Sequence, residues 1–143
     1  MDLEELNVYR LSMDMGDKVW NIVKEWDNFT KDTIGKQLVR AADSVAANIS
    51  EGFGRFFYKD SKLFYYYSRG SLYETKTFLN KAHNRSLIGK EEYEKLVKDI
   101  QIISIKLNNY IRSIGKTTGN TEVSEDSVEY NDPSNSKIEL DDL

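Results

Sequence analysis

The side chains in this sequence that could carry out catalysis or bind a metal are one histidine, His83, and the acidic residues. The 143-residue chain contains no cysteine. The absence of cysteine excludes thiolate nucleophiles, disulfides and cysteine-ligated metals. His83 lies in a polar run at the predicted end of a helix, where a cation interacts favourably with the helix dipole. We therefore interpret His83 as a helix-end residue rather than as the base of a catalytic triad.

Two pairs of acidic residues have the spacing with which helical nucleotide hydrolases bind magnesium. Glu91 and Glu94 are separated by three positions, as are Asp14 and Asp17, and carboxylate oxygens are the ligands that Mg²⁺ prefers. However, Glu91 and Glu94 open a predicted helix, where anions are favourable in any protein. We predict that the chain is not an enzyme and has no metal or cofactor, and keep a magnesium-dependent nucleotide hydrolase or nuclease as an alternative.

A stripe of polar residues runs through the segment RAADSVAANISEGFGR, residues 40–55. At about 100° per residue, these side chains fall within about 80° of one another on a helix, beside an apolar face that we expect to enter the core. The alanines make this helix thin, so that neighbours can approach closely, and Gly52 and Gly54 fit a helix C-cap. We predict that the stripe organises helix and subunit packing rather than catalysis. It consists of Arg40, Ser44, Asn48, Glu51 and Arg55.

Aromatic residues are concentrated between residues 53 and 78, which contain ten of the fifteen Phe and Tyr residues. Four consecutive aromatics, residues 64–67, cover every side of a helix, so some must be exposed or buried against a partner chain. Interleaved cations suit nucleic acid, because rings stack on bases and cations meet phosphates. Tyr, Phe and Arg are also enriched at homo-oligomer interfaces, and we favour this interpretation, which does not exclude the first. The candidate nucleic-acid contacts are Arg55, Lys59, Lys62, Arg69 and Lys76.

Four helices must position these residues. Apolar residues recur at spacings of three and four over residues 8–26, 34–49, 64–82 and 96–114, which is typical of amphipathic helices. Asn28 and Thr30 are predicted to be loop or cap residues. Short connections predict an all-α, up-and-down antiparallel four-helix bundle over residues 1–116. The sequence shows no secretory signal and no apolar run near the roughly 20 residues that span a membrane, so we expect a cytoplasmic protein.

Charge is unevenly distributed along the chain. Residues 1–116 contain 19 Lys and Arg and 16 Asp and Glu, a net charge of +3, whereas residues 117–143 contain one Lys and eight Asp and Glu, a net charge of −7. The overall charge of −4 therefore does not exclude nucleic acid as a partner. Composition predicts that residues 117–143 form an acidic, disordered tail, in which Ile138, Leu140 and Leu143 could be a short docking motif.

The motif QLVRAADSVAANISEGFGR, followed by F-x5-GSLYE, resembles bacterial four-helix-bundle proteins encoded in intervening sequences of 23S rRNA genes. The accessory subunits of diversity-generating retroelements are related to them. The resemblance covers about residues 6–115. Its motif positions are Arg40, Ala41, Ser44, Asn48, Glu51, Gly52 and Arg55, followed by Gly70, Ser71 and Glu74. We predict that Gly52, Gly70, Ser71 and Glu74 contribute to structure and assembly together with the polar stripe.

The resemblance implies a bundle that assembles into a homopentamer and has no established enzymatic activity. The retroelement members resemble RNA- and DNA-binding adaptors that hold a reverse transcriptase. We therefore expect a non-enzymatic homo-oligomer, a pentamer, that acts as an adaptor associated with nucleic acid or ribonucleoprotein, without a membrane or a small-molecule substrate. The alternative is a protein-interaction scaffold that binds no nucleic acid.

Overall fold

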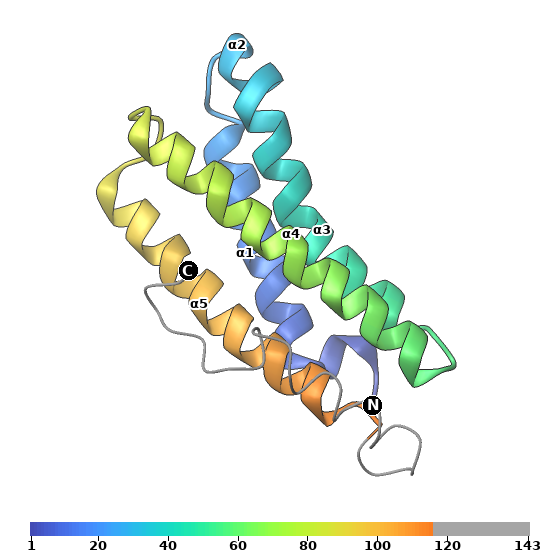
Figure 1. The fold of residues 1–143 in the computed structure, drawn as a ribbon. Helices are drawn as coiled ribbons and strands as arrows, with labels where there is room; N and C mark the ends of the chain where they lie inside the picture. The colour runs from blue at the N-terminus through green and yellow to red at the C-terminus, as the bar shows by residue number, and fades with distance from the viewer. Residues whose placement is uncertain (116–143) are drawn as a thin grey trace.

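The chain folds as a bundle of four long helices. The structure, a computed structural model, describes residues 1–115, and these contain no strand. Successive long helices run in opposite directions (Figure 1), which confirms the predicted all-α, up-and-down architecture. The predicted tail, residues 117–143, lies outside the described residues. The long helices are α1 (Asn7–Val23), α3 (Lys36–Phe53), α4 (Tyr58–Asn84) and α5 (Lys90–Ser113).

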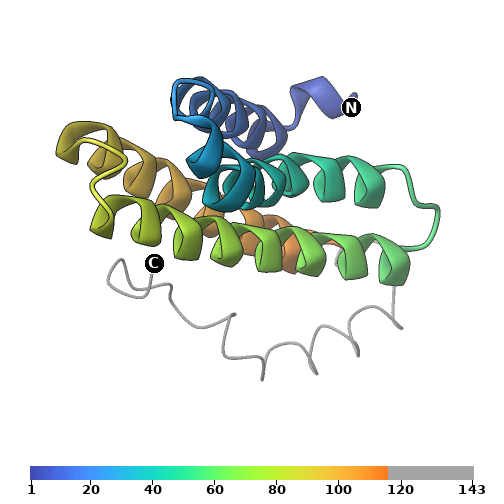
Figure 2. The same ribbon diagram turned by 90° about the horizontal axis from the view of Figure 1, so that it is seen from above.

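The helices are arranged in a ring, in which α3 contacts α1 and α4, and α5 contacts α4 and α1. Viewed from above, α3 lies between α1 and α4 (Figure 2). A 3-10 turn, Leu3–Glu5, precedes α1. No helix within residues 1–115 is both long enough and apolar enough to cross a membrane.

The connection between α1 and α3 is helical, which corrects the prediction that Asn28 and Thr30 are loop or cap residues. Both lie in the short helix α2 (Asn28–Thr30), which continues through a π-helical turn, Lys31–Gly35, into α3. The cap is one residue earlier, because the Thr30 backbone N–H donates a 2.8 Å hydrogen bond to the Asp27 carboxylate. This hydrogen bond lowers the pKa of Asp27 below its ordinary value.

The turn between α4 and α5 is anchored to the connection between α1 and α2. Ser86 adopts a left-handed backbone conformation with φ of 61°, and the Leu87 backbone N–H closes the end of α4 with a 2.9 Å hydrogen bond to the Ala82 carbonyl. The Trp26 indole N–H donates to the Leu87 carbonyl at 3.0 Å. Consequently the α1–α2 connection and the α4–α5 turn are held together at one end of the bundle.

The core contains the apolar series that define the helices in the sequence. On α3 the buried side chains follow the predicted face, and on α5 they recur at spacings of three and four. Tyr65 is fully buried and packs edge-to-face on Tyr110 of α5 with ring centroids 5.1 Å apart. Burial raises the pKa of Tyr65 above its ordinary value. The buried residues of α3 and α5 include Leu38, Ala41, Ala42, Val45, Ile49, Leu96, Ile100, Ile103, Leu107 and Ile111.

Candidate assembly and nucleic-acid interface

The polar stripe of α3 borders the core, as its helical geometry predicts. Arg40, Glu51 and Arg55 are exposed, whereas Ser44 and Asn48 are half-buried. The Asn48 side-chain amide donates to the Ser44 carbonyl at 2.9 Å, and Arg55 pairs with Glu51 at 2.6 Å. Both contacts join residues four positions apart on one helix. The role of the stripe in subunit packing stays a prediction.

Gly52 contributes to packing rather than to the helix cap. Sequence reasoning assigned it with Gly54 to the C-cap, but Gly52 is buried inside α3 and Gly54 alone is the cap residue. A Cβ atom on Gly52 would lie 2.7 Å from Tyr65 Cε1 and 2.9 Å from the Ser61 carbonyl oxygen of α4. Gly52 therefore permits the close approach of α3 to α4.

A buried polar contact between α3 and α4 is absent from the sequence predictions. The Ser68 hydroxyl donates to the Val45 carbonyl at 2.7 Å across the two helices. Ser61, Ser68 and Thr75 are all buried and are separated by seven positions, so they lie on one face of α4. This seven-residue spacing of small hydroxyl residues is the sequence signal that could have identified the face of α4 that packs on α3.

The connection between α3 and α4 and the first two residues of α4 present exposed aromatic and basic side chains, here called the aromatic–basic tip (residues 55–59). Phe56 is 89% exposed and Phe57 is 64% exposed, with their rings in edge-to-face contact at 4.9 Å. Lys59 is exposed. The Arg55 guanidinium lies 4.5 Å from the centroid of the Phe64 ring, so it is held between this ring and Glu51.

The other predicted nucleic-acid contacts occupy a different part of α4. Lys62, Arg69 and Lys76 are separated by seven positions and therefore share one face of the helix. Lys62 is buried, and Arg69 and Lys76 are half-buried. Arg69 donates to Asn108 Oδ1 of α5 at 3.2 Å and stacks over the Tyr66 ring at 4.5 Å. Arg55 and Lys59 are thus exposed at the tip, whereas these three cations are buried or half-buried on one face of α4.

The outer face of α4, defined here by Leu63, Tyr67, Gly70, Tyr73 and Glu74, is exposed along its length. Leu63 is 46% exposed and Tyr67 is 50% exposed. A Cβ atom on Gly70 would meet nothing within 4 Å. Ser71, the other predicted assembly residue of α4, is half-buried, and its carbonyl accepts a 2.7 Å hydrogen bond from Thr75.

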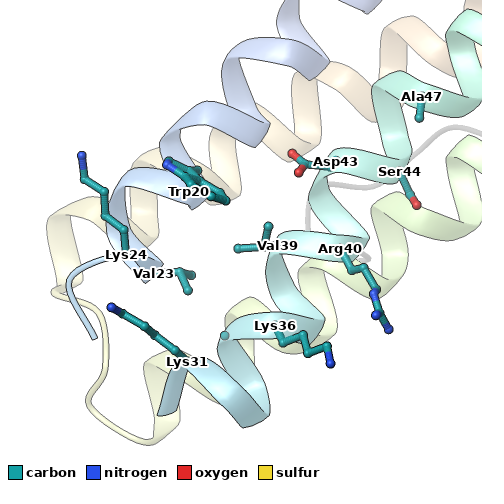
Figure 3. A pocket seen from close by; sticks show the side chains of 11 residues that line it. Trp20, Val23, Lys24, Lys31, Lys36, Val39, Arg40, Asp43, Ser44 and Ala47 are labelled. Carbon is teal, nitrogen blue, oxygen red and sulfur yellow. The ribbon is translucent and has the colours of Figure 1, made fainter. Parts of the chain in front are cut away.

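A groove between α1 and α3 was not predicted from the sequence. It has a volume of about 670 Å³. Val23 and Val39 point toward one another across it, and Trp20, which is 56% exposed, lines it together with Asp43 (Figure 3). Asp43 is exposed, but partial desolvation of its carboxylate and the neighbouring Asp17 carboxylate raise its pKa. Four cations also line the groove: Lys24, Lys31, Lys36 and Arg40.

Comparison with known proteins identifies the family. Residues 4–109 match the sequence model of the 23S rRNA-intervening sequence protein family. The chain belongs to this family. The matched segment includes the polar stripe, the aromatic–basic tip, the outer face of α4 and the groove.

A solved structure supports the same fold for this 23S rRNA-intervening sequence protein. It is the 1.70 Å crystal structure of a protein with unknown function from the S23 ribosomal protein family of Bacteroides thetaiotaomicron VPI-5482. The two chains are 22% identical, and the alignment covers 74% of this chain and 99% of the other with a TM-score of 0.67. At this identity the likeness concerns the fold alone. No curated protein matches the chain.

The two acidic pairs considered for metal binding lie on two different helices of this family member. Glu91 and Glu94 are exposed in the first turns of α5, and Asp14 and Asp17 are exposed on α1. No group of three or more potential metal ligands occurs in residues 1–115. His83 is half-buried and stacks on the Tyr93 ring, with centroids 4.0 Å apart. The position of His83 near the end of α4 agrees with its interpretation as a helix-end residue.

Proposed function

We propose that this protein is a non-enzymatic, cytoplasmic adaptor that self-associates and binds single-stranded nucleic acid at its aromatic–basic tip. The observation that carries the proposal is the exposure of adjacent aromatic rings, Phe56 and Phe57, at the end of the bundle. Large aromatic side chains grouped on a surface are typical of binding sites. Arg55 and Lys59 flank these rings in the sequence, so one short segment supplies both stacking surfaces and positive charge.

This combination suits single-stranded RNA or DNA better than a duplex. Unpaired bases stack on aromatic side chains, each contributing about 1–3 kcal/mol, without a requirement for a particular sequence. Cations beside the rings meet the phosphates and make the affinity depend on salt. Residues 1–116 have a net charge of only +3, so we expect stacking to contribute more than long-range electrostatic attraction.

We propose that the outer face of α4 is the surface through which copies of the chain associate. Leu63 and Tyr67 would place apolar area at such an interface. Glycine inside a helix costs about 0.5–1 kcal/mol relative to alanine. At Gly70 this cost would be offset in an oligomer, because the absence of a side chain lets a second backbone approach closely. The resemblance to homopentameric bundle proteins supports a pentamer. The same resemblance supports a ribonucleoprotein or a nucleic-acid enzyme, such as a reverse transcriptase, as the partner.

The nucleic-acid proposal is tested by changing the tip in the full chain. Fluorescence anisotropy with a labelled single-stranded RNA should show that Phe56→Ser/Phe57→Ser weakens binding at least tenfold, since loss of one stack costs about 1–3 kcal/mol. Phe29→Ser is the matched control, because Phe29 is 78% exposed on α2 at the opposite end of the bundle (Figure 1). Equal affinities of the wild type and the double variant would refute the assignment of the tip.

The self-association proposal has its own test. Sedimentation of the wild type should show an oligomer that dissociates in Leu63→Glu/Tyr67→Glu, because charges buried at an interface without partners are costly. Ile102→Glu/Ile105→Glu is the control, since these α5 residues are 46% and 40% exposed but lie outside the proposed interface. A monomeric wild type would overturn the proposal.

The alternative functions give different results in these assays. An intact oligomer that binds neither RNA nor DNA would favour a protein-interaction scaffold. Magnesium-dependent hydrolysis of a nucleotide or nucleic acid that is abolished by Glu91→Ala or Glu94→Ala would contradict the non-enzymatic assignment.

A further inference from the structure

The groove between α1 and α3 combines an apolar wall with a positively charged rim. Trp20, Val23 and Val39 supply the apolar surface. Its volume of about 670 Å³ is within the range of roughly 300–1,000 Å³ that is usual for binding sites. An exposed tryptophan beside such a hollow leaves apolar area that a ligand could cover.

The cations of the rim are available for a ligand. Lys24, Lys31, Lys36 and Arg40 line the groove, and none of them forms an ion pair within residues 1–115. The one carboxylate that lines it is Asp43 (Figure 3). Four positive charges against one negative charge favour an anionic ligand at the Lys24–Arg40 end of the groove.

The π-helical turn gathers two of these cations. The Lys36 backbone N–H donates to the Lys31 carbonyl, five positions earlier, so the two residues are one turn apart along the helix. In a regular α-helix, residues five apart would differ by about 140° around the axis. A π-turn therefore allows both side chains to line the same groove, and such turns occur frequently at functional sites.

We propose that this groove binds residues 138–143 of the same chain. The segment reads IELDDL. In an extended conformation, alternating residues point to opposite sides, so Ile138 and Leu140 can cover Trp20 and the two valines while the acidic residues meet the lysines. Residues 117–143 carry a net charge of −7, which complements the rim. This pairing of apolar and acidic residues matches the chemistry of the groove.

The length of the chain permits this contact within one molecule. Gly115 follows α5 at the end of the bundle near the N-terminus, whereas the groove lies toward the other end (Figures 1 and 3). Residue 138 is 23 positions beyond Gly115, which spans up to about 75 Å in an extended chain. The 24 residues of α5 extend only about 36 Å. Covalent attachment gives the segment an effective concentration in the millimolar range, which favours the same chain over a second copy.

Zero-length carbodiimide cross-linking of the full chain at low concentration, followed by peptide mass spectrometry, tests the proposal. Glu139, Asp141 and Asp142 should cross-link to Lys24, Lys31 and Lys36 several times more often than to Lys95 and Lys98 of α5. Lys95 and Lys98 are exposed as well, so they report random collisions of the segment with the bundle. Cross-links distributed evenly over both groups would overturn the proposal.

Two full-chain variants show whether the contact depends on the proposed chemistry. Ile138→Ser/Leu140→Ser keeps every carboxylate, and it should lower the groove cross-links to the level of Lys95 and Lys98. Trp20→Ser should have the same effect from the other side of the contact. Unchanged cross-links in both variants would refute an apolar contact. An equimolar mixture of ¹⁴N- and ¹⁵N-labelled chains, unfolded and refolded together, distinguishes the source. Cross-links within one chain contain a single isotope, whereas mixed-isotope products in about half of the cross-links would assign the segment to a second copy and refute the intramolecular contact.

This inference is independent of the proposed function. The aromatic–basic tip and the outer face of α4 share no residue with the groove. A chain without nucleic-acid binding could therefore still show the cross-links, and failure of the cross-links would leave the RNA and sedimentation assays unaffected.

Discussion

Replacing Gly52 by alanine tests how closely α3 and α4 are packed. The new Cβ atom would lie 2.7 Å from Tyr65 Cε1, 2.9 Å from the Ser61 carbonyl oxygen and 3.0 Å from Tyr65 Cδ1. The Ser61 oxygen belongs to the backbone of α4, so it can move only if the helix moves. The Tyr65 ring is fully buried and lies against Tyr110, which restricts its movement to one side. Neither contact can therefore be relieved by a local rotation of an exposed side chain.

The expected cost follows from two opposing effects. Overpacking of a close-packed core costs about 1–3 kcal/mol, whereas replacing glycine by alanine inside a helix contributes about 0.5–1 kcal/mol of stability. At the midpoints of these two ranges the first effect prevails, so the free energy of unfolding should fall by about 1 kcal/mol. For a domain of this size, such a change lowers the midpoint of thermal unfolding by about 2–8 °C.

Thermal unfolding followed by circular dichroism measures this change. Gly70→Ala is the matched control, because it is the same substitution inside α4 at a position with nothing within 4 Å. At protein concentrations at which the chain is monomeric, it should raise the midpoint through the helix-propensity gain alone. A Gly52→Ala chain that unfolds at or above the wild-type midpoint would refute the packing argument.

Two further predictions concern stability. Asp43→Asn should stabilise the protein at pH 7, because partial desolvation and then Asp17 raise the pKa of Asp43 in the folded state, so its charged form destabilises the fold above that pKa. The gain in stability should shrink as pH falls through the folded-state pKa of Asp43 and vanish below the ordinary value of 3.8. Urea unfolding of the wild type and the variant at pH 7 and pH 3.5 measures this gain, and a gain that persists at pH 3.5 would contradict the prediction. Ser68→Ala removes the 2.7 Å hydrogen bond to the Val45 carbonyl and should cost about 0.5–1.5 kcal/mol in chemical unfolding. Thr77→Ala, which removes a hydroxyl bonded at 3.1 Å to Tyr73 on an exposed part of α4, should change stability by less than about 0.5 kcal/mol.

The fold could be predicted because helical periodicity reports burial without knowledge of the neighbouring helix. Leu38, Val45 and Ile49 recur at helical spacing and are buried, whichever helix covers them. The roles of the two motif glycines could not be read in this way. Gly52 and Gly70 both lie inside helices, yet one touches Tyr65 and the other faces open space. That difference depends on where the neighbouring helix lies, which periodicity does not determine.

The candidate cations show the same limit. Lys59 and Lys62 both follow the aromatic run FFY and look equivalent in the sequence. Three positions on a helix differ by about 300°, which is only about 60° in the opposite sense, so the two lysines lie near the same border between a covered face and solvent. Lys59 is exposed and Lys62 is buried. Whether a cation near the start of a helix is exposed could therefore be predicted only with knowledge of how α4 packs against the rest of the bundle.

The groove could not be predicted from the sequence, because the backbone that forms it is not a regular α-helix. Its cations come from the end of α1, the π-helical turn and the first turns of α3, and their spacings of seven, five and four positions fit no single regular helix. A helical projection that assumes α geometry separates Lys31 from Lys36, whereas the π-turn hydrogen bond places them one turn apart. Gly35, the last residue of the π-helical turn, packs closely against its surroundings. A Cβ atom at this position would lie 2.8 Å from Val23 Cγ1 and 3.0 Å from the Thr30 carbonyl oxygen. One close-packed glycine and the irregular turn that ends at it thus account for both the groove and the failure to predict it.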